Sequence, residues 1–205
     1  MAGKASLARG SKAVRLRRSG PTYQVAKPAQ LRVVVSPVRG SIYSTVAAFG
    51  PMSVREVADL IGAAPSSLYY HIERLLAVGL LVEAGSRQIA KKPEQLYDAP
   101  SRSMRMTEAI KDPRNERYLK AIVASICKQA SRDFARARGA PHRRISGAGK
   151  NLGFARLVGR PDAATLTRVN VHLEAIAELF AGAADGEGGI VTISWVLSPQ
   201  AQRTK

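Results

Sequence analysis

Four polar side chains lie close together at a spacing that places them on the leading turns of one helix: Ser66, Ser67, Tyr69 and Tyr70. Leu68, Ile72 and Leu75 interleave with them at three- to four-residue intervals, which predicts an apolar underside for that helix. Small polar and amphipathic groups in this position can contact base edges and phosphates, because a DNA major groove admits one helix. The pattern therefore indicates contacts with double-stranded DNA.

The helix that carries these groups is expected to run from Pro65 to about Val78. Proline is tolerated in a first turn, where its missing amide has no helical partner, and Gly79 supplies a left-handed stop. A shorter helix should precede it and end at Ile61, since Ser53-Val54-Arg55-Glu56 has the capping-box pattern. Two helices joined by a tight turn predict a helix-turn-helix.

Further elements are expected on both sides of this pair. Ser36-Pro37 begins a helix that should end at Phe49. After the pair, Leu80 to Val82 and Gln95 to Asp98 are candidate strands, separated by the polar stretch from Glu83 to Glu94. Together they predict a long hairpin, or wing.

Residues 31 to 98 resemble the winged-helix domain of the ArsR-like (arsenical-resistance-repressor) superfamily of bacterial transcription regulators. The segments that carry the resemblance are Ser36-Pro37-Val38-Arg39, Met52 to Ala58, Pro65 to Ile72, Leu75 and Gly79 to Val82. The resemblance implies that the helix from Pro65 is the recognition helix and that the protein is a homodimer on a palindromic operator. It also implies that Arg87, Lys91 and Lys92 lie on or near the wing. The basic residues proposed for DNA contact are therefore these three and Arg74. Metal-sensing members carry a cysteine pair where this chain has Val54 to Val57, so we do not expect thiolate metal sensing.

The C-terminal half contains a second set of predicted elements. A helix from about 114 to 138 should carry a broad apolar stripe, whose proposed dimerisation residues are Leu119, Ile122, Val123 and Ile126. The stripe could instead line an effector pocket or belong to a core. Asp162 is expected to cap a helix through Phe180, and residues 190 to 197 give the strongest strand pattern, with a weaker one at 154 to 158.

Positive charge is concentrated outside the predicted helix-turn-helix. Residues 1–40 hold nine Lys and Arg and no acid, residues 41–100 hold five against six, and residues 101–205 hold eighteen against nine, for a net charge of +17. Such a balance favours nucleic acid as the partner, with an anionic membrane surface as the rival. Because the central segment is nearly neutral, charge alone does not give it specificity.

Other chemistry has little support in the sequence. Cys127 is the single cysteine, so an internal disulfide or a cysteine-based metal site is excluded. His71, His142 and His172 show no metal-ligand or catalytic pattern, and Gly147-Ala148-Gly149-Lys150 lacks the spacing of a phosphate-binding loop. We therefore expect no catalysis, no metal and no cofactor. A cytoplasmic protein without a membrane segment is expected, with an organellar transit peptide as the alternative for the N-terminus.

These patterns predict a mainly α (α+β) chain: a winged helix-turn-helix with a C-terminal helical dimerisation portion. The expected domains are a flexible basic arm (1–30), the DNA-binding domain (31–99), a linker (100–113), and a dimerisation and possible effector portion (114–205). The predicted function is that of a sequence-specific DNA-binding transcription regulator, and repression is the mode of action we expect. The alternatives are a sensor whose C-terminal portion binds a small molecule, and a basic structural protein associated with RNA or the chromosome.

Overall fold

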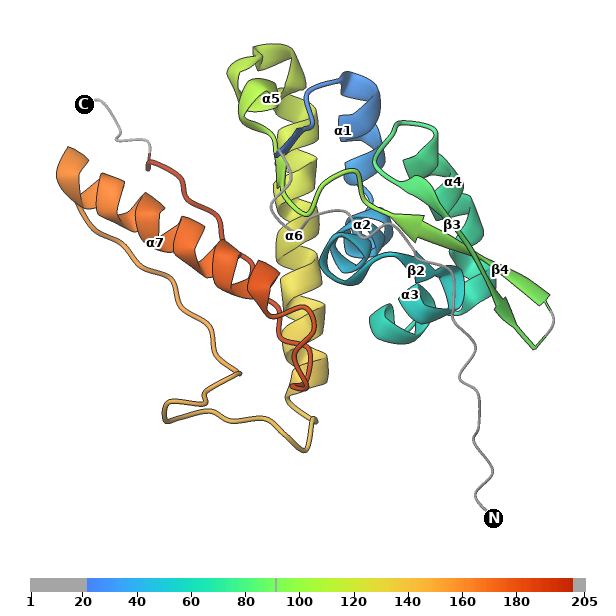
Figure 1. Cartoon of the computed structure of the whole chain (residues 1–205). Coiled ribbons are helices and arrows are strands. Elements are labelled where there is room, and N and C mark those ends of the chain that lie inside the picture. The colour runs from blue at the N-terminus through green and yellow to red at the C-terminus, as the bar shows by residue number, and fades with distance from the viewer. Residues whose placement is uncertain (1–21, 91, 201–205) are drawn as a thin grey trace. The chain divides into compact units, whose positions relative to one another are not determined.

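The computed structural model describes residues 22–90 and 92–200, and its elements are shown in Figure 1. The chain divides into two compact units. One, the winged unit, consists of the chain up to Gln24 together with Ser41–Arg105, and the other, the helical unit, consists of Val25–Gly40 together with everything from Met106 onward. The fold is an α+β winged helix-turn-helix with further helices.

Local capping explains where the first helices of the winged unit begin and end. Helix α2 spans Pro37–Phe49 and α3 spans Val54–Ile61. The Ser53 hydroxyl accepts a hydrogen bond from the amide of Glu56 at 3.3 Å, and the Glu56 carboxylate accepts one from the amide of Ser53 at 2.8 Å. Gly62 ends α3 with φ of 67°. The predicted capping box is confirmed.

The segment from Pro65 is built from two kinds of helix. Pro65–Ser67 forms a 3₁₀ turn, η1, and Tyr69–Leu76 forms α4, so the α-helical part is shorter than predicted at both ends. Gly79 has φ of 70°, as expected of a left-handed stop, and the amide of Leu80 donates to the carbonyl of Leu75 at 2.9 Å. The core beneath this segment is almost completely inaccessible to solvent and consists of Leu68, Ile72, Leu75, Leu80 and Leu81. Burial of each such side chain contributes about 1.5–3 kcal/mol.

The wing is formed by longer strands than the sequence predicts. β3 spans Val82–Ile89 and β4 spans Lys92–Asp98, paired antiparallel, and a short strand β2, Met52–Ser53, adds to the far edge of β4. Leu80 and Leu81 lie before β3 in the core. Residues 83, 86–89 and 92–94, expected as a loop, are paired between the two strands. The register shift between Glu83 and Ser86 contains Gly85 at φ of 91°, a conformation that glycine adopts without strain.

The expected basic arm ends earlier than residue 30. Residues 1–21 lie outside the described part of the chain. In the winged unit, β1 (Tyr23–Gln24) pairs in parallel with β5 (Met104–Arg105). In the helical unit, Pro28–Val34 forms α1, because Leu31, Val33 and Val34 provide an apolar face that becomes buried.

The helical unit continues with α5 (Thr107–Lys111), the 3₁₀ turn η2 (Pro113–Asn115), α6 (Glu116–Ala137) and α7 (Ala163–Gly182). Helix α5 lies inside the segment expected to be a linker. The Asp162 carboxylate caps α7 by accepting from the amide of Thr165 at 2.7 Å, as predicted.

The predicted strands at 190–197 and 154–158 do not form, so that part of the prediction is wrong. In the first segment Val191 is 41% exposed and Trp195 56%, and in the second Phe154 is 89% exposed. A strand requires hydrogen bonds to a neighbouring strand, and neither segment has such a partner among the described residues, whatever its propensity.

Candidate nucleic-acid interface

The leading turns of the second helix present a polar edge to solvent. Tyr69 is 54% exposed and Tyr70 61%, and the nearby exposed polar residues are Ser66, Ser67, Glu73 and Arg74. Leu68 and Ile72, between them in sequence, are buried. The polar groups predicted to contact DNA therefore lie on the outer surface of η1 and α4, and the apolar groups hold this segment on the core.

Two local contacts restrict the orientation of this polar edge. The Ser67 hydroxyl donates to the carbonyl of Ala64 at 2.7 Å, which closes the turn before α4 and leaves the hydroxyl oxygen able to accept. The rings of Tyr70 and His71 meet edge to face, with 5.5 Å between centroids. These contacts reduce the rotamer freedom that binding would otherwise have to restrict.

The wing is connected to α3 by an ion-paired arginine. A guanidinium nitrogen of Arg87, Nη2, lies 2.8 Å from a carboxylate oxygen of Glu56 and 2.8 Å from one of Glu94, its cross-strand neighbour. Hydrogen bonds to Glu94 and then to Glu56 raise the pKa of Arg87. The sequence offers Arg87 as a DNA contact; in the structure its guanidinium is ion-paired with Glu56 and Glu94, and its side chain is 39% exposed.

Glu56 links this pair to the helix cap. Partial burial by itself would raise the pKa of Glu56, but hydrogen bonds from the Ser53 amide and the Arg87 guanidinium outweigh it and lower the pKa. One carboxylate therefore serves both the N-terminus of α3 and the first strand of the wing. The sequence reveals the cap, because capping is local, and does not reveal the arginine partner, which depends on the register of the hairpin.

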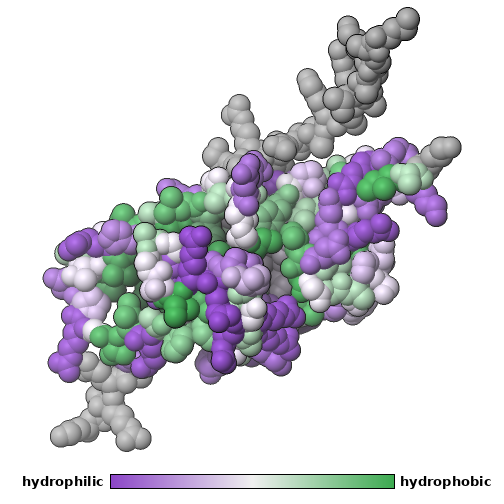
Figure 2. All heavy atoms as spheres, turned by 90° about the horizontal axis from the view of Figure 1, so that it is seen from below, coloured by the Kyte–Doolittle hydropathy of each residue, from purple (hydrophilic) through white to green (hydrophobic). Residues whose placement is uncertain are grey.

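Of the two lysines predicted for the wing, Lys91 and Lys92, the structure describes only Lys92. Lys92 begins β4 and is exposed, whereas Lys91 lies outside the described residues. Figure 2 shows the projecting hairpin mostly in hydrophilic colours, with an apolar spot near its tip, where Ile89 is 42% exposed. The end of the wing is thus a polar surface with one positive group at its described edge.

The base of the wing is acidic by comparison. Burial raises the pKa of the Tyr97 phenol, and the charges of Glu83, Tyr69 and Glu73 add to the rise. Carboxylates at this place repel DNA phosphates.

A buried ion pair, missed by the sequence analysis, fixes the end of α2 to the base of the wing, where β4 ends. Arg102 donates to the carbonyls of Val46 at 3.0 Å and Gly50 at 2.9 Å, and to the carboxylate of Asp98 at 3.0 Å. Asp98 is 1% exposed. Gly50 is needed at this crossing, since a Cβ there would lie 2.6 Å from both the Asp98 carboxylate and the Val46 carbonyl.

The proposed dimerisation residues on α6 do not share one environment. Ile122 is 5% exposed, on a helix that packs against α1, and Leu119 is half-buried. Val123 and Ile126 are 40% and 38% exposed. The expected stripe is therefore divided between a buried part within the helical unit and an apolar part that faces solvent.

No helix of the described chain is both long and apolar enough to cross a membrane. Within the same residues there is no group of three or more His, Cys, Asp and Glu placed to hold a metal ion. Cys127 is exposed on α6.

Comparison with known families supports the helix-turn-helix interpretation. Residues 34–84 match the family model described as a helix-turn-helix domain, which covers α2, α3 and α4 and enters β3. No curated protein matches the chain. The match and the fold together support a helix-turn-helix regulator that binds DNA, the class in which such domains typically occur.

Proposed function

We propose that the chain is a sequence-specific transcription regulator that reads double-stranded DNA with the leading edge of α4. The observation that carries the proposal is the exposure of Tyr69 and Tyr70, at 54% and 61%, on a segment whose neighbours Leu68 and Ile72 are buried. This arrangement fixes the helix on its core and leaves hydroxyl groups and ring edges for the bases. One helix of this width fits a major groove.

Affinity and specificity come from different parts of the chain in this proposal. Residues 41–100 hold five Lys and Arg against six acids, so this central segment gains little affinity for DNA from charge alone. Arg74 on α4 and Lys92 on the wing supply local phosphate contacts, and the basic flanking segments supply most of the salt-dependent affinity. Arg87 contributes by holding the wing in place.

We propose further that the regulator is ArsR-like, independent of thiolates, and works as a homodimer in the cytoplasm. Val123 and Ile126 supply apolar surface on α6 for a second copy. A twofold dimer presents two α4 helices to the two halves of a palindromic operator. Repression by occupying the operator needs no further activity of the protein.

The sensor alternative has less support than the sequence suggested. Its pocket requires the segment 190–197 as a strand beside α7, whereas Ile193 and Leu197 are 55% and 51% exposed. The apolar side chains of that segment do not enclose a cavity with α7. We therefore propose a transcription regulator and propose no small-molecule site between α7 and residues 190–197.

Selection from a library of random duplexes tests the proposal. The full chain should enrich one motif, and at about 0.15 M salt it should bind that motif at least about a thousandfold tighter than random DNA. Enrichment of a palindrome supports the homodimer. Equal affinity for RNA, random DNA and every enriched duplex would reject sequence recognition and favour the structural, RNA-associated alternative.

A further inference from the structure

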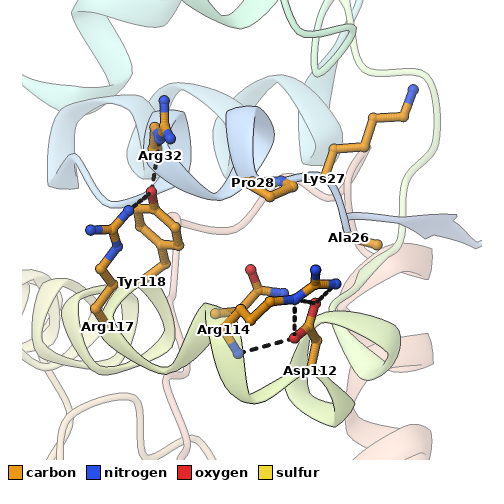
Figure 3. Close-up of a pocket in the computed structure, with 9 residues that line it drawn as sticks. Ala26, Lys27, Pro28, Arg32, Asp112, Arg114, Arg117 and Tyr118 are labelled. Carbon is orange, nitrogen blue, oxygen red and sulfur yellow. Dashed lines mark hydrogen bonds and ion pairs between the residues drawn. The ribbon is translucent and has the colours of Figure 1, made fainter.

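A shallow cavity of about 520 Å³ in the helical unit has four cations and one carboxylate among its nine lining residues (Figure 3). Its charged residues are Lys27, Arg32, Arg114, Arg117 and a single carboxylate, Asp112. Lys27 precedes α1 and Arg32 lies in its last turn, whereas Asp112 and Arg114 lie at η2 and Arg117 lies in the first turn of α6. Helices α1 and α6 pack together. Ligand pockets of this size, about 300–1,000 Å³, are usually apolar, so the basic lining indicates an anionic ligand.

Two of the arginines converge on one neutral oxygen. The Arg32 Nε donates to the Tyr118 hydroxyl oxygen at 2.8 Å, and an Arg117 Nη donates to the same oxygen at 2.7 Å. Their guanidinium carbons lie 5.8 Å and 4.6 Å from the centroid of the Tyr118 ring. Figure 3 shows both side chains reaching the hydroxyl from different sides. The Tyr118 phenol therefore orients the guanidinium groups of Arg32 and Arg117, and no carboxylate among the described residues neutralises either of them.

The one acid of the cavity is already occupied. Asp112 accepts from the Arg114 guanidinium in contacts of 2.9–3.1 Å and from the Arg114 amide at 3.0 Å. Arg114 and Asp112 therefore cancel each other. Lys27, Arg32 and Arg117 have no carboxylate partner in the described part of the chain, which leaves three positive charges at the cavity.

The floor beside these charges has a fixed shape. Asn115 is 2% exposed, and its side-chain amide donates to the carbonyl of Ala109 at 3.2 Å. The Asp112 cap closes the turn before α6. A site with preset backbone and oriented guanidinium groups loses less entropy when a ligand binds.

We propose that this cavity binds a phosphate group, with Arg32 and Arg117 as its principal ligands. The planar guanidinium presents paired N–H donors whose spacing matches phosphate oxygens, and the bonds are charge-assisted. The phosphate belongs either to a DNA backbone or to a small phosphorylated compound. The proposal does not rest on base recognition by α4.

The test uses the full chain and two probes, inorganic pyrophosphate and a random-sequence duplex. Calorimetric titration with pyrophosphate compares wild type, the double variant R32Q/R117Q and the charge-matched control R156Q/R160Q, whose arginines are exposed outside the cavity. The cavity variant should weaken binding by about tenfold or more, and the control should not. Y118F, which keeps the ring and the charges, should weaken binding less because it only releases the guanidinium groups. Circular dichroism checks that each variant folds.

The duplex arm separates the two sources of phosphate. If the site holds DNA backbone, R32Q/R117Q should reduce the salt slope of duplex binding by about 0.9 for each phosphate that the two arginines neutralise in the wild type. An unchanged slope together with weakened pyrophosphate binding assigns the site to a small phosphorylated compound. The proposal is overturned if neither measurement responds to R32Q/R117Q, or if both arginine pairs weaken pyrophosphate binding equally. If the wild-type chain selects no duplex motif but binds pyrophosphate through Arg32 and Arg117, the proposed function is rejected and the phosphate site is retained.

Discussion

The guanidinium of Arg87, on the first strand of the wing, lies 2.8 Å from the carboxylate of Glu56 in the first turn of α3. Glu56 also accepts from the amide of Ser53. The wing is thus attached to the helix that precedes the recognition segment. Two roles of Arg87, positioning of the wing and direct contact with DNA, can therefore be distinguished by experiment.

Exchange of Glu56 for glutamine should weaken duplex binding although it removes a negative charge. Glutamine still caps α3 but loses the ion pair to Arg87, so the wing becomes less ordered. We expect E56Q and R87Q to lower specific affinity by a similar factor, measured by fluorescence anisotropy, with R168Q on α7 as the charge control. Tighter binding by E56Q, beside weaker binding by R87Q, would instead make Arg87 a phosphate contact. Neither exchange should cost more than about 1 kcal/mol of stability, because the pair is partly exposed.

The same carboxylate predicts a dependence of stability on pH. The pKa of Glu56 in the folded protein is below the ordinary value of 4.5, so its contribution to stability is present above that value and is lost as the pH falls through the folded pKa. Urea unfolding of wild type and E56Q should therefore differ most above pH 4.5 and converge below it. A constant difference down to strongly acidic pH would contradict the lowered pKa.

Removal of the Arg102 charge should destabilise the winged unit strongly. R102Q leaves the 1%-exposed Asp98 without its cation and frees the carbonyls at the end of α2. Breaking one side of a buried pair costs about 3–5 kcal/mol, which denaturant unfolding would detect. R55Q, on the exposed face of α3, serves as the control and should cost less than about 0.5 kcal/mol. Equal stabilities of the two variants would show that the pair is not structural.

Substitution of the exposed apolar residues of α6 should separate the two subunits. V123S/I126S removes apolar surface at positions that are 40% and 38% exposed, so the helical unit should stay folded. Sedimentation should show a dimer for wild type and a monomer for the variant, with L179S on α7 as a control that remains dimeric. A wild-type monomer at micromolar concentration, or a dimeric variant, would reject this surface as the seam.

The starts of α3 and α7 were predictable because their determinants are local. Ser53 and Glu56 cap α3 within four residues, and Asp162 caps α7 in the same way. The exposure of Tyr69 and Tyr70 followed from the apolar spacing of Leu68 and Ile72, since that spacing fixes which face is buried.

Pairing across the chain was not predictable from the same patterns. The wing's length depends on the register that sets Arg87 opposite Glu94, and the polar sequence of that stretch favoured a loop. Residues 190–197 have the composition of a strand but no neighbouring strand in the described chain. The hydrogen bonds from Arg102 to Val46 and Gly50 join residues more than fifty positions apart, which no local signal encodes.

Motif selection with Y69A/Y70A tests the central claim most directly. If the leading edge of α4 reads the bases, wild type should enrich one duplex motif, and Y69A/Y70A should lose that preference while it keeps its affinity for random DNA and its salt slope. F154A, which removes an 89%-exposed ring from the helical unit, should select the wild-type motif. An unchanged motif from Y69A/Y70A would contradict the claim that these side chains recognise DNA.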